Sequence, residues 1–233
     1  MSKTVVISQS NYLPWKGFFD LIRSADEFVL LDSVQYTRRD WRNRNIIKTP
    51  AGPKWLTIAV EIKGRYLQSV DETRIADPGW AGAHIRSIEL NYKRAAAYHH
   101  IAPWLFAGIE AVADLPLLSE VNESLLRAIC RRLGLERPFR RCTELLPRDA
   151  MGEMEPTERL VRLCLAAGAT RYLSGPAAKA YLDPARFAAH GIELAWMEYG
   201  PYPPYPQLWG EFDHRVSVID LLMNTGDDAI TYL

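Results

Sequence analysis

The side chains that could do chemistry gather directly after the first two predicted strands. Residues 5–7 form an apolar run that predicts a buried strand, and residues 27–32 form a second one that ends on Asp32. A helix predicted over 15–25 joins them, as in a strand–helix–strand unit. Amide and aromatic side chains follow the first strand: Gln9, Asn11, Tyr12 and Trp15. Because ligands of such units bind at the carboxyl ends of the strands, we expect these groups to meet.

The next segment, residues 33–45, has neither an apolar period nor a hydrophobic face. It carries amides, aromatic rings and guanidinium groups: Gln35, Tyr36, Arg38, Arg39, Trp41, Arg42, Arg44 and Asn45. Over residues 36–48, five basic side chains stand against one acidic one. Arginine binds phosphate and carboxylate through paired, charge-assisted hydrogen bonds, so we predict a site for a small anionic ligand. The alternative is that the arginines are a solvated face and that the rings only tie the loop to the core.

Composition narrows the class of partner. The 233 residues include 28 basic and 28 acidic side chains, so the net charge is zero and bulk electrostatics favours neither nucleic acid nor an anionic membrane. No apolar run approaches the length of a membrane span, and no signal peptide precedes the first strand. Cys130, Cys142 and Cys164 lack metal-ligand spacing. They predict buried free thiols and a cytoplasmic protein.

The rest of the chain alternates helices and strands, which predicts an α/β fold with a parallel, Rossmann-like sheet and flanking helices. Strands are expected over 54–62, 67–75, 137–146, 171–175 and 192–197, with 46–47 as a hairpin partner of the first of these. Helices are expected over 80–94, 96–113, 117–133, 159–167, 184–190 and 217–224, and a loop over 146–155. We expect a single α/β domain over residues 1–233, with a mostly helical insert at about 80–135.

Further candidate site residues lie later in the chain. His84 and Tyr92 share one face of a predicted helix, and Ser174 ends a predicted strand. A histidine on a helix is also commonly structural. Residues 199–207 hold four prolines and three tyrosines, among them Tyr205, followed by Gln207. This segment predicts a rigid loop packed over the site; the alternative is a polyproline ligand for another protein.

Several blocks resemble the WbqC-like protein family. The first runs Gln9-Ser10-Asn11-Tyr12-Leu13-Pro14-Trp15-Lys16-Gly17-Phe18-Phe19 and continues through Leu31-Asp32-Ser33-Val34-Gln35-Tyr36 and Trp41-Arg42-Asn43-Arg44-Asn45. Later blocks include Trp80, His84, Tyr92, Tyr172-Leu173-Ser174-Gly175-Pro176 and Tyr205-Pro206-Gln207. Ser10 and Ala59 stand where the family usually has proline. The resemblance implies a cytoplasmic transferase that attaches an amino acid such as glycine, or another acyl group, to an activated amino-sugar for bacterial surface polysaccharide (O-antigen).

The opening unit is also similar to that of nucleotidyltransferases. Those enzymes carry His-x-Gly-His after the proline to hold triphosphate, whereas the aligned positions here are Trp15, Lys16, Gly17 and Phe18. Both histidines are missing, which puts adenylyl transfer by that route in doubt.

Three hypotheses about function remain open. The first is an acyl- or aminoacyl-transferase on a nucleotide-sugar: Arg39, Arg42 and Arg44 hold a diphosphate, Tyr12, Trp15, Tyr36 or Trp41 stack on a base or sugar, and Asp32 or His84 is the general base. The second is an ATP-using ligase or nucleotidyltransferase, with Mg²⁺ on Asp32. The third is a non-catalytic binding protein. The cofactor stays open, and exposed aromatic rings in the tail would permit a homodimer.

Overall fold

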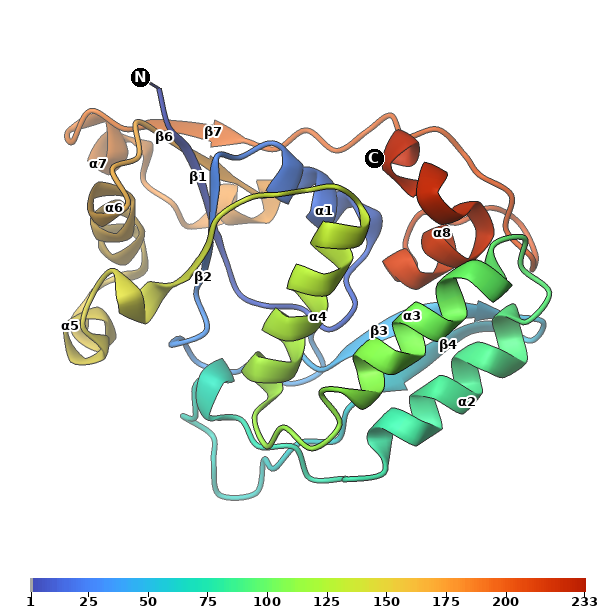
Figure 1. The fold of residues 1–233 in the computed structure, drawn as a ribbon. Helices are drawn as coiled ribbons and strands as arrows, with labels where there is room; N and C mark the ends of the chain where they lie inside the picture. The colour runs from blue at the N-terminus through green and yellow to red at the C-terminus, as the bar shows by residue number, and fades with distance from the viewer. Residues whose placement is uncertain (1) are drawn as a thin grey trace.

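A computed structural model describes residues 2–233 and contains a five-stranded parallel sheet (Figure 1). The strand order is β5-β2-β1-β6-β7. The strands are β1 (Thr4–Ser8), β2 (Glu27–Leu30), β5 (Phe139–Arg141), β6 (Arg171–Ser174) and β7 (Glu193–Trp196). The prediction of an α/β fold with a parallel sheet and flanking helices is therefore confirmed.

Helices cover both faces of this sheet because neighbouring strand residues point to opposite sides. Val6 and Phe28 belong to one core cluster, together with α1 (Lys16–Arg23) and α4 (Leu118–Arg132). Val5 and Val29 belong to a second cluster, with α6 (Pro156–Ala166) and α7 (Pro184–Ala188). All four strand residues are fully buried, and each such side chain stabilises the fold by about 1.5–3 kcal/mol.

A hairpin and three helices intervene between β2 and β5, the last of the helices being α4 (Figure 1). The hairpin strands are β3 (Arg44–Thr49) and β4 (Gly52–Thr57), and the preceding helices are α2 (Trp80–Tyr92) and α3 (Tyr98–Glu110). Helix α8 (Val218–Thr225), with the 3₁₀ turn η4 (Gly226–Tyr232), packs against α3 and β3. The C-terminal part of the chain therefore supports the segment that follows β2.

Two expected elements are wrong. Residues 67–75 contain no strand but the 3₁₀ turn η1 (Val70–Glu72), because the Glu72 carboxylate accepts hydrogen bonds from the Ser69 amide (2.9 Å) and hydroxyl (2.8 Å). The expected loop over 146–155 contains helix α5 (Arg148–Glu153). The strand expected over 137–146 is short, since the 3₁₀ turn η2 (Cys142–Glu144) follows β5 at once. A further 3₁₀ turn, η3 (Pro176–Ala180), follows β6.

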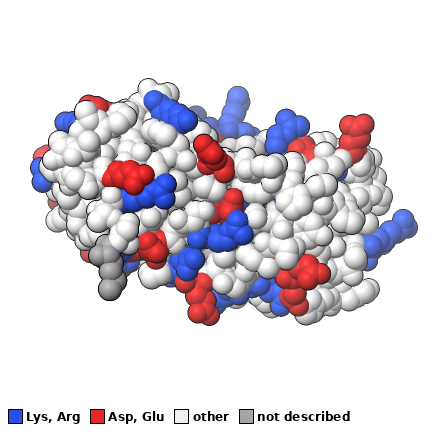
Figure 2. All heavy atoms as spheres, turned by 90° about the horizontal axis from the view of Figure 1, so that it is seen from above, with Lys and Arg blue, Asp and Glu red and all other residues white. Residues whose placement is uncertain are grey.

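The distribution of surface charge and the burial of the cysteines agree with what the composition predicts. Figure 2 shows basic and acidic side chains interspersed over one face rather than gathered in one basic area. All three cysteines are buried free thiols, and burial raises the pKa of Cys130 and of Cys164 to about 12. Within residues 2–233, no helix combines the length and the apolar character that crossing a membrane requires.

Candidate functional site

The loop between β1 and α1 is held in one conformation by distant parts of the chain. Leu13 has a φ of +43°, a left-handed conformation that costs a leucine about 1–2 kcal/mol. Its carbonyl oxygen accepts a hydrogen bond from Ser217 Oγ (2.7 Å), and that of Tyr12 accepts one from Asn45 Nδ2 (3.2 Å). The Tyr12 amide donates to the carbonyl of Trp41 at 3.0 Å. These bonds offset the strain and pre-organise the loop.

Trp15 lies over the start of α1, and Gly17 makes room for it. A Cβ atom at Gly17 would lie 2.3 Å from the Trp15 ring, closer than atoms can approach. Tyr199 and Tyr202 also pack against this indole, with ring centroids 5.1 and 6.1 Å away. The ring is therefore held by three residues, Gly17, Tyr199 and Tyr202.

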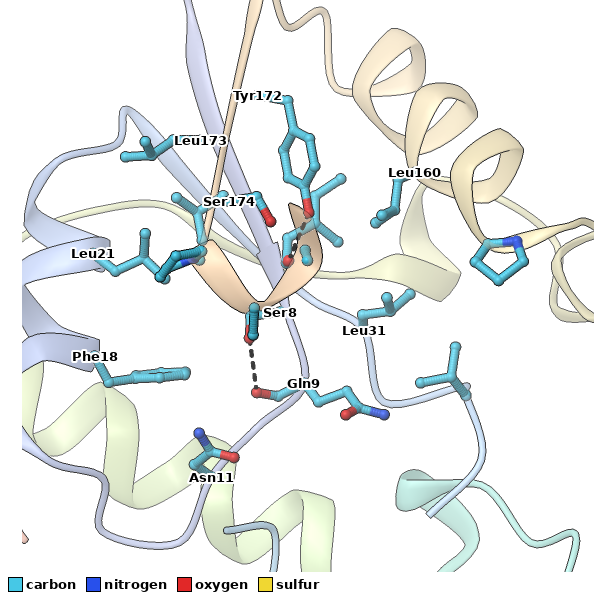
Figure 3. A pocket seen from close by; sticks show the side chains of 18 of the residues that line it. Ser8, Gln9, Asn11, Phe18, Leu21, Leu31, Leu160, Tyr172, Leu173 and Ser174 are labelled. Carbon is cyan, nitrogen blue, oxygen red and sulfur yellow. Dashed lines mark hydrogen bonds between the residues drawn. The ribbon is translucent and has the colours of Figure 1, made fainter. Parts of the chain in front are cut away.

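A cavity of about 760 Å³ opens between the carboxyl ends of β1 and β6. Figure 3 shows Gln9 and Asn11, from the loop, and Tyr172 and Ser174, from β6, around it. Its polar lining residues include Gln9, Asn11, Arg42, Glu155, Arg159 and Ser174; its aromatic ones are Trp15, Phe18, Trp41, Tyr172, Tyr181 and Tyr199. A mostly apolar cavity with a few converging polar groups is the usual form of a small-molecule site.

Arg42 is the arginine of the predicted cluster that lines this cavity. Its guanidinium donates to Asn11 Oδ1 and pairs with Asp40 at 3.7 Å. Burial lowers its pKa, which Asp40 and Asp32 oppose, and an arginine remains charged at neutral pH. Its buried Nε has no hydrogen-bond partner among residues 2–233. Arg42 is thus a cation held in place by its neighbours, and Arg159 is a second cationic residue of the lining.

The other predicted arginines lie elsewhere. Arg39 is exposed with a φ of +59°, and the guanidinium of Arg44 lies 4.2 Å from the centre of the Trp55 ring. Neither lines the cavity. Gln35 is exposed and donates to the carbonyl of Tyr66 at 2.9 Å, while Tyr36 is buried in the core.

Asp32 faces away from the large cavity and supports its wall. Its Oδ1 accepts a hydrogen bond from the Ser10 amide (2.7 Å), and its Oδ2 accepts one from Ser119 Oγ (2.5 Å). Burial raises the pKa of this carboxyl, which these bonds and Arg42 oppose. It borders a smaller cavity of about 200 Å³, whose lining includes Arg148. Asp32 therefore orders the loop after β1.

His84 and Tyr12 form a buried pair. The Tyr12 hydroxyl bonds His84 Nδ1 at 2.8 Å, and His84 Nε2 lies 3.2 Å from the carbonyl of Thr57. Since a carbonyl only accepts, Nε2 carries the proton and Nδ1 accepts from the tyrosine. Burial lowers the pKa of His84 to about 4, so the ring is neutral. Neither residue lines the large cavity.

Tyr92, Tyr205 and Gln207 meet in a second buried network, around Asp220. The hydroxyls of Tyr92 (2.8 Å) and Tyr205 (2.9 Å) donate to its carboxylate. Gln207 donates to the Tyr205 hydroxyl at 3.0 Å and accepts from Lys48 Nζ at 2.8 Å. This network ties the segment 199–207 to α8, and of that segment only Tyr199 lines the large cavity.

The start of α6 and the residues after β6 form a wall of the cavity that was not predicted from the sequence. Glu155 caps α6 by accepting from the Thr157 amide at 3.1 Å, a bond that lowers its pKa. Arg159 lines the cavity one turn later and donates to the carbonyl of Met151 at 2.8 Å. The sequence signal for this wall was Pro156, which marks the start of a helix. A helix that joins two parallel strands runs back along the sheet from its carboxyl edge, so the first turn of the helix lies near that edge.

Asn122 and Ser10 were also missed. Asn122 Nδ2 donates to Ser10 Oγ (3.1 Å) and to the carbonyl of Arg42 (2.8 Å), so α4 positions both the loop and the arginine. Across residues 2–233, no three His, Cys, Asp or Glu side chains are grouped to hold a metal ion.

Comparison with known proteins places the chain in a family. A mycobacterial protein named "Uncharacterized protein Rv1507c" (Mycobacterium tuberculosis, strain ATCC 25618 / H37Rv) is 46% identical over 231 residues, which cover 99% of this chain and 97% of the relative. A comparison with solved structures found no match. The model of the WbqC-like protein family matches residues 9–232. This chain therefore belongs to the WbqC-like protein family.

Proposed function

We propose that this protein is a transferase that binds a nucleotide-linked amino-sugar in the large cavity and attaches an amino acid, such as glycine, or another acyl group to its amine. The modified sugar would serve bacterial surface-polysaccharide synthesis, in the cytoplasm. The observation that carries the proposal is the position of the cavity. In the sheet, β2 lies on one side of β1 and β6 lies on the other, so the strand order reverses between β1 and β6. The cavity lies at this point of reversal. Open parallel sheets bind ligands at this point.

The size and lining of the cavity agree with a nucleotide-sugar. About 760 Å³ is within the usual range for sites that enclose a ligand of this kind, roughly 300–1,000 Å³. Arg42 supplies a charge-assisted donor for a phosphate oxygen, and Gln9 and Asn11 lie beside it. The rings of Trp15, Tyr172 and Tyr181 offer surfaces for a base or a sugar.

Glu155 is the carboxylate that lines the cavity. In direct transfer, the amine of the sugar attacks the acyl carbonyl, a new C–N bond forms, the donor's leaving group departs and the amine loses one proton. We assign that proton to Glu155 in preference to Asp32 or His84, which lie outside the lining. Positioning of the two substrates would supply most of the rate enhancement.

A second candidate is an ATP- and Mg²⁺-dependent ligase or nucleotidyltransferase. Numbered along the chain within the sheet, the strand order is 3-2-1-4-5, the order of the first five strands of the nucleotide-binding doubly wound fold. Mg²⁺ in such sites is held largely by substrate phosphates and water. Such an enzyme would use the same cavity, with ATP in place of the nucleotide-sugar as its ligand.

The test is a binding measurement with matched arginine variants. Nucleoside diphosphates, nucleotide-sugars and Mg·ATP are titrated into the wild type, Arg42→Ala and Arg39→Gly. Arg42→Ala removes the Arg42 guanidinium from the cavity, where Arg159 remains, and should weaken binding of a nucleotide-sugar by about 10- to 100-fold. Arg39→Gly removes an exposed arginine from a position whose φ suits glycine, so binding should stay within about twofold of wild type.

Equal losses of nucleotide-sugar affinity in the two variants would show that the ligand binds at the exposed loop and would overturn the proposal. Binding of Mg·ATP alone, lost in Arg42→Ala, would favour the ligase.

A further inference from the structure

A second, smaller cavity adjoins the large one. Its volume is about 210 Å³, and it shares Asn11, Trp15 and Trp41 with its neighbour. Pro14, Asn45 and Arg215 complete its lining. The volume is below the roughly 300–1,000 Å³ of sites that enclose a whole drug-sized ligand, and it suits a single ring.

Two indole rings border this cavity. Trp15 is packed against Tyr199 and Tyr202, as described above. The Trp41 backbone is held by a bond from its amide to Asp40 Oδ1 (2.7 Å) and by one from the Tyr12 amide to its carbonyl (3.0 Å), yet 43% of the residue is exposed. An exposed indole on a held backbone offers a flat apolar face to a ligand.

The aromatic surface continues beyond the cavity. The rings of Trp41 and Trp55 are 5.4 Å apart at an angle of 35°, and 42% of Trp55 is exposed. The Arg44 guanidinium rests on Trp55 and so keeps that ring in place. Neighbouring exposed tryptophans beside a cavity form an apolar patch of the kind that marks ligand-binding grooves and interaction sites.

The polar side chains of the small cavity are two amides and the guanidinium of Arg215. Asn11 Oδ1 accepts from Arg42, while its Nδ2 makes no hydrogen bond to any other group of residues 2–233. Asn45 Oδ1 accepts from the Ile46 amide (2.8 Å) and its Nδ2 donates one bond to Tyr12, which leaves a second N–H. Arg215, the charged residue of the lining, is mostly exposed and pairs with Asp213 at 3.0 Å.

These features identify the ligand by its chemistry. A sugar ring has an apolar C–H face, which packs on an indole, and a rim of hydroxyls, which accept hydrogen bonds from amides. Flat rings with free amide donors therefore favour a saccharide.

We propose that the small cavity is a saccharide subsite. One sugar ring stacks on Trp41 with its hydroxyls on the amides of Asn11 and Asn45, and a second ring of the same saccharide extends over Trp55. The inference rests on the proposed function and deepens it, because the nucleotide would occupy the large cavity and the sugar ring the small one, with its amine on the side that opens into the large cavity, which Glu155 lines.

The first experiment follows the indole N–H signals of the ¹⁵N-labelled protein by NMR. N-acetylglucosamine and its β1,4-linked disaccharide, both without a nucleotide, are titrated into the protein. The Trp41 signal is identified as the one that is missing in Trp41→Phe. The proposal expects the Trp41 signal to shift with both sugars. The disaccharide should bind about three- to tenfold more tightly than the monosaccharide, a gain that Trp55→Ala abolishes.

The second experiment compares UDP, GDP, CDP and dTDP with the corresponding nucleotide-sugars. For the pair that binds wild type, the ratio of the two dissociation constants measures the contribution of the sugar. Trp41→Ala should reduce this ratio by about three- to tenfold, and Trp41→Phe should keep it within about twofold. Tyr66→Ala, which removes a ring that is 74% exposed and lines neither cavity, should leave it unchanged.

The two experiments separate the two proposals. If free sugars shift the Trp41 signal but no nucleotide binds, the subsite stands and the proposed function fails. If a nucleotide-sugar binds with a ratio that Trp41→Ala leaves unchanged, the proposed function stands and the subsite is wrong. If no sugar and no nucleotide-sugar shifts the Trp41 signal, the subsite is wrong.

Discussion

At the scale of single residues, burial separates the side chains that support the site from those that line it. Asp32, His84 and Tyr92 have the chemistry of a catalytic group, but each is less than 7% exposed and is hydrogen-bonded within the fold. Arg42 and Gln9 reach the cavity. The same loop and its neighbours thus contain both kinds of residue, a few positions apart.

The buried pair of Tyr12 and His84 predicts a pH-dependent stability. The folded chain keeps His84 neutral down to a pKa of about 4, whereas in the unfolded chain the ring takes up a proton near its ordinary 6.5. Stability is therefore complete above pH 6.5 and falls as the pH drops from 6.5 to 4, by about 3 kcal/mol. Urea unfolding at pH 7.5 and pH 4.5 measures this loss.

Two histidine variants check the assignment. His84→Gln should lower stability at pH 7.5 and remove most of the loss on acidification. His99→Gln, at an exposed position, should behave like wild type. If His84→Gln loses as much stability on acidification as wild type, groups other than His84 cause the loss and the assignment is wrong.

At the scale of elements, the start of α1 makes a prediction that opposes helix propensity. Alanine is favoured over glycine in a helix by about 1 kcal/mol, but a Cβ at Gly17 would overlap the Trp15 ring. Gly17→Ala should therefore destabilise the protein by about 1–3 kcal/mol and displace the indole from both cavities. Thermal or urea unfolding of the single variant measures the change.

A double-mutant cycle isolates the cause. In a Trp15→Ala background the obstacle is gone, and Gly17→Ala should be neutral or stabilising by up to about 1 kcal/mol. A loss of the same size in both backgrounds would show that something other than the Trp15 ring requires glycine.

The elements themselves were largely predictable from the sequence. Apolar runs indicated β1 and β2, which are buried on both faces, and periodicity indicated α1 and the later helices, each of which buries one regular face. Neither signal indicated η1, where the capping of Ser69 by Glu72 decides the conformation, or α5, a helix of 6 residues that is too short for a period.

The site was predictable in part. The loop after β1 and Arg42 follow from the rule that binding groups lie at the carboxyl ends of parallel strands. The sequence could not separate Arg42 from Arg39 and Arg44, since that depends on which side chain α4 and Asn11 hold in place. Glu155 and Tyr199 come from segments far along the chain, and only the order of strands in the sheet brings them to the cavity.

At the scale of the whole molecule, one core cluster joins the sheet to the segment that follows β2. It includes Phe28 of the sheet, Ile88 of α2, Leu105 of α3 and Leu222 of α8. We propose that residues 1–233 form one folding unit, and we predict a single urea transition, identical by tryptophan fluorescence and far-ultraviolet circular dichroism. Two separated transitions would divide the chain into independent units.

The central claim is that the cavity between β1 and β6 binds a nucleotide-sugar. A crystal structure of the protein with the tightest-binding nucleotide-sugar of the titrations tests it most directly. The account predicts the nucleotide in this cavity, with a phosphate oxygen within hydrogen-bonding distance of the Arg42 guanidinium. A nucleotide bound instead beside Arg39 and Arg44, with the cavity filled by water alone, would contradict it.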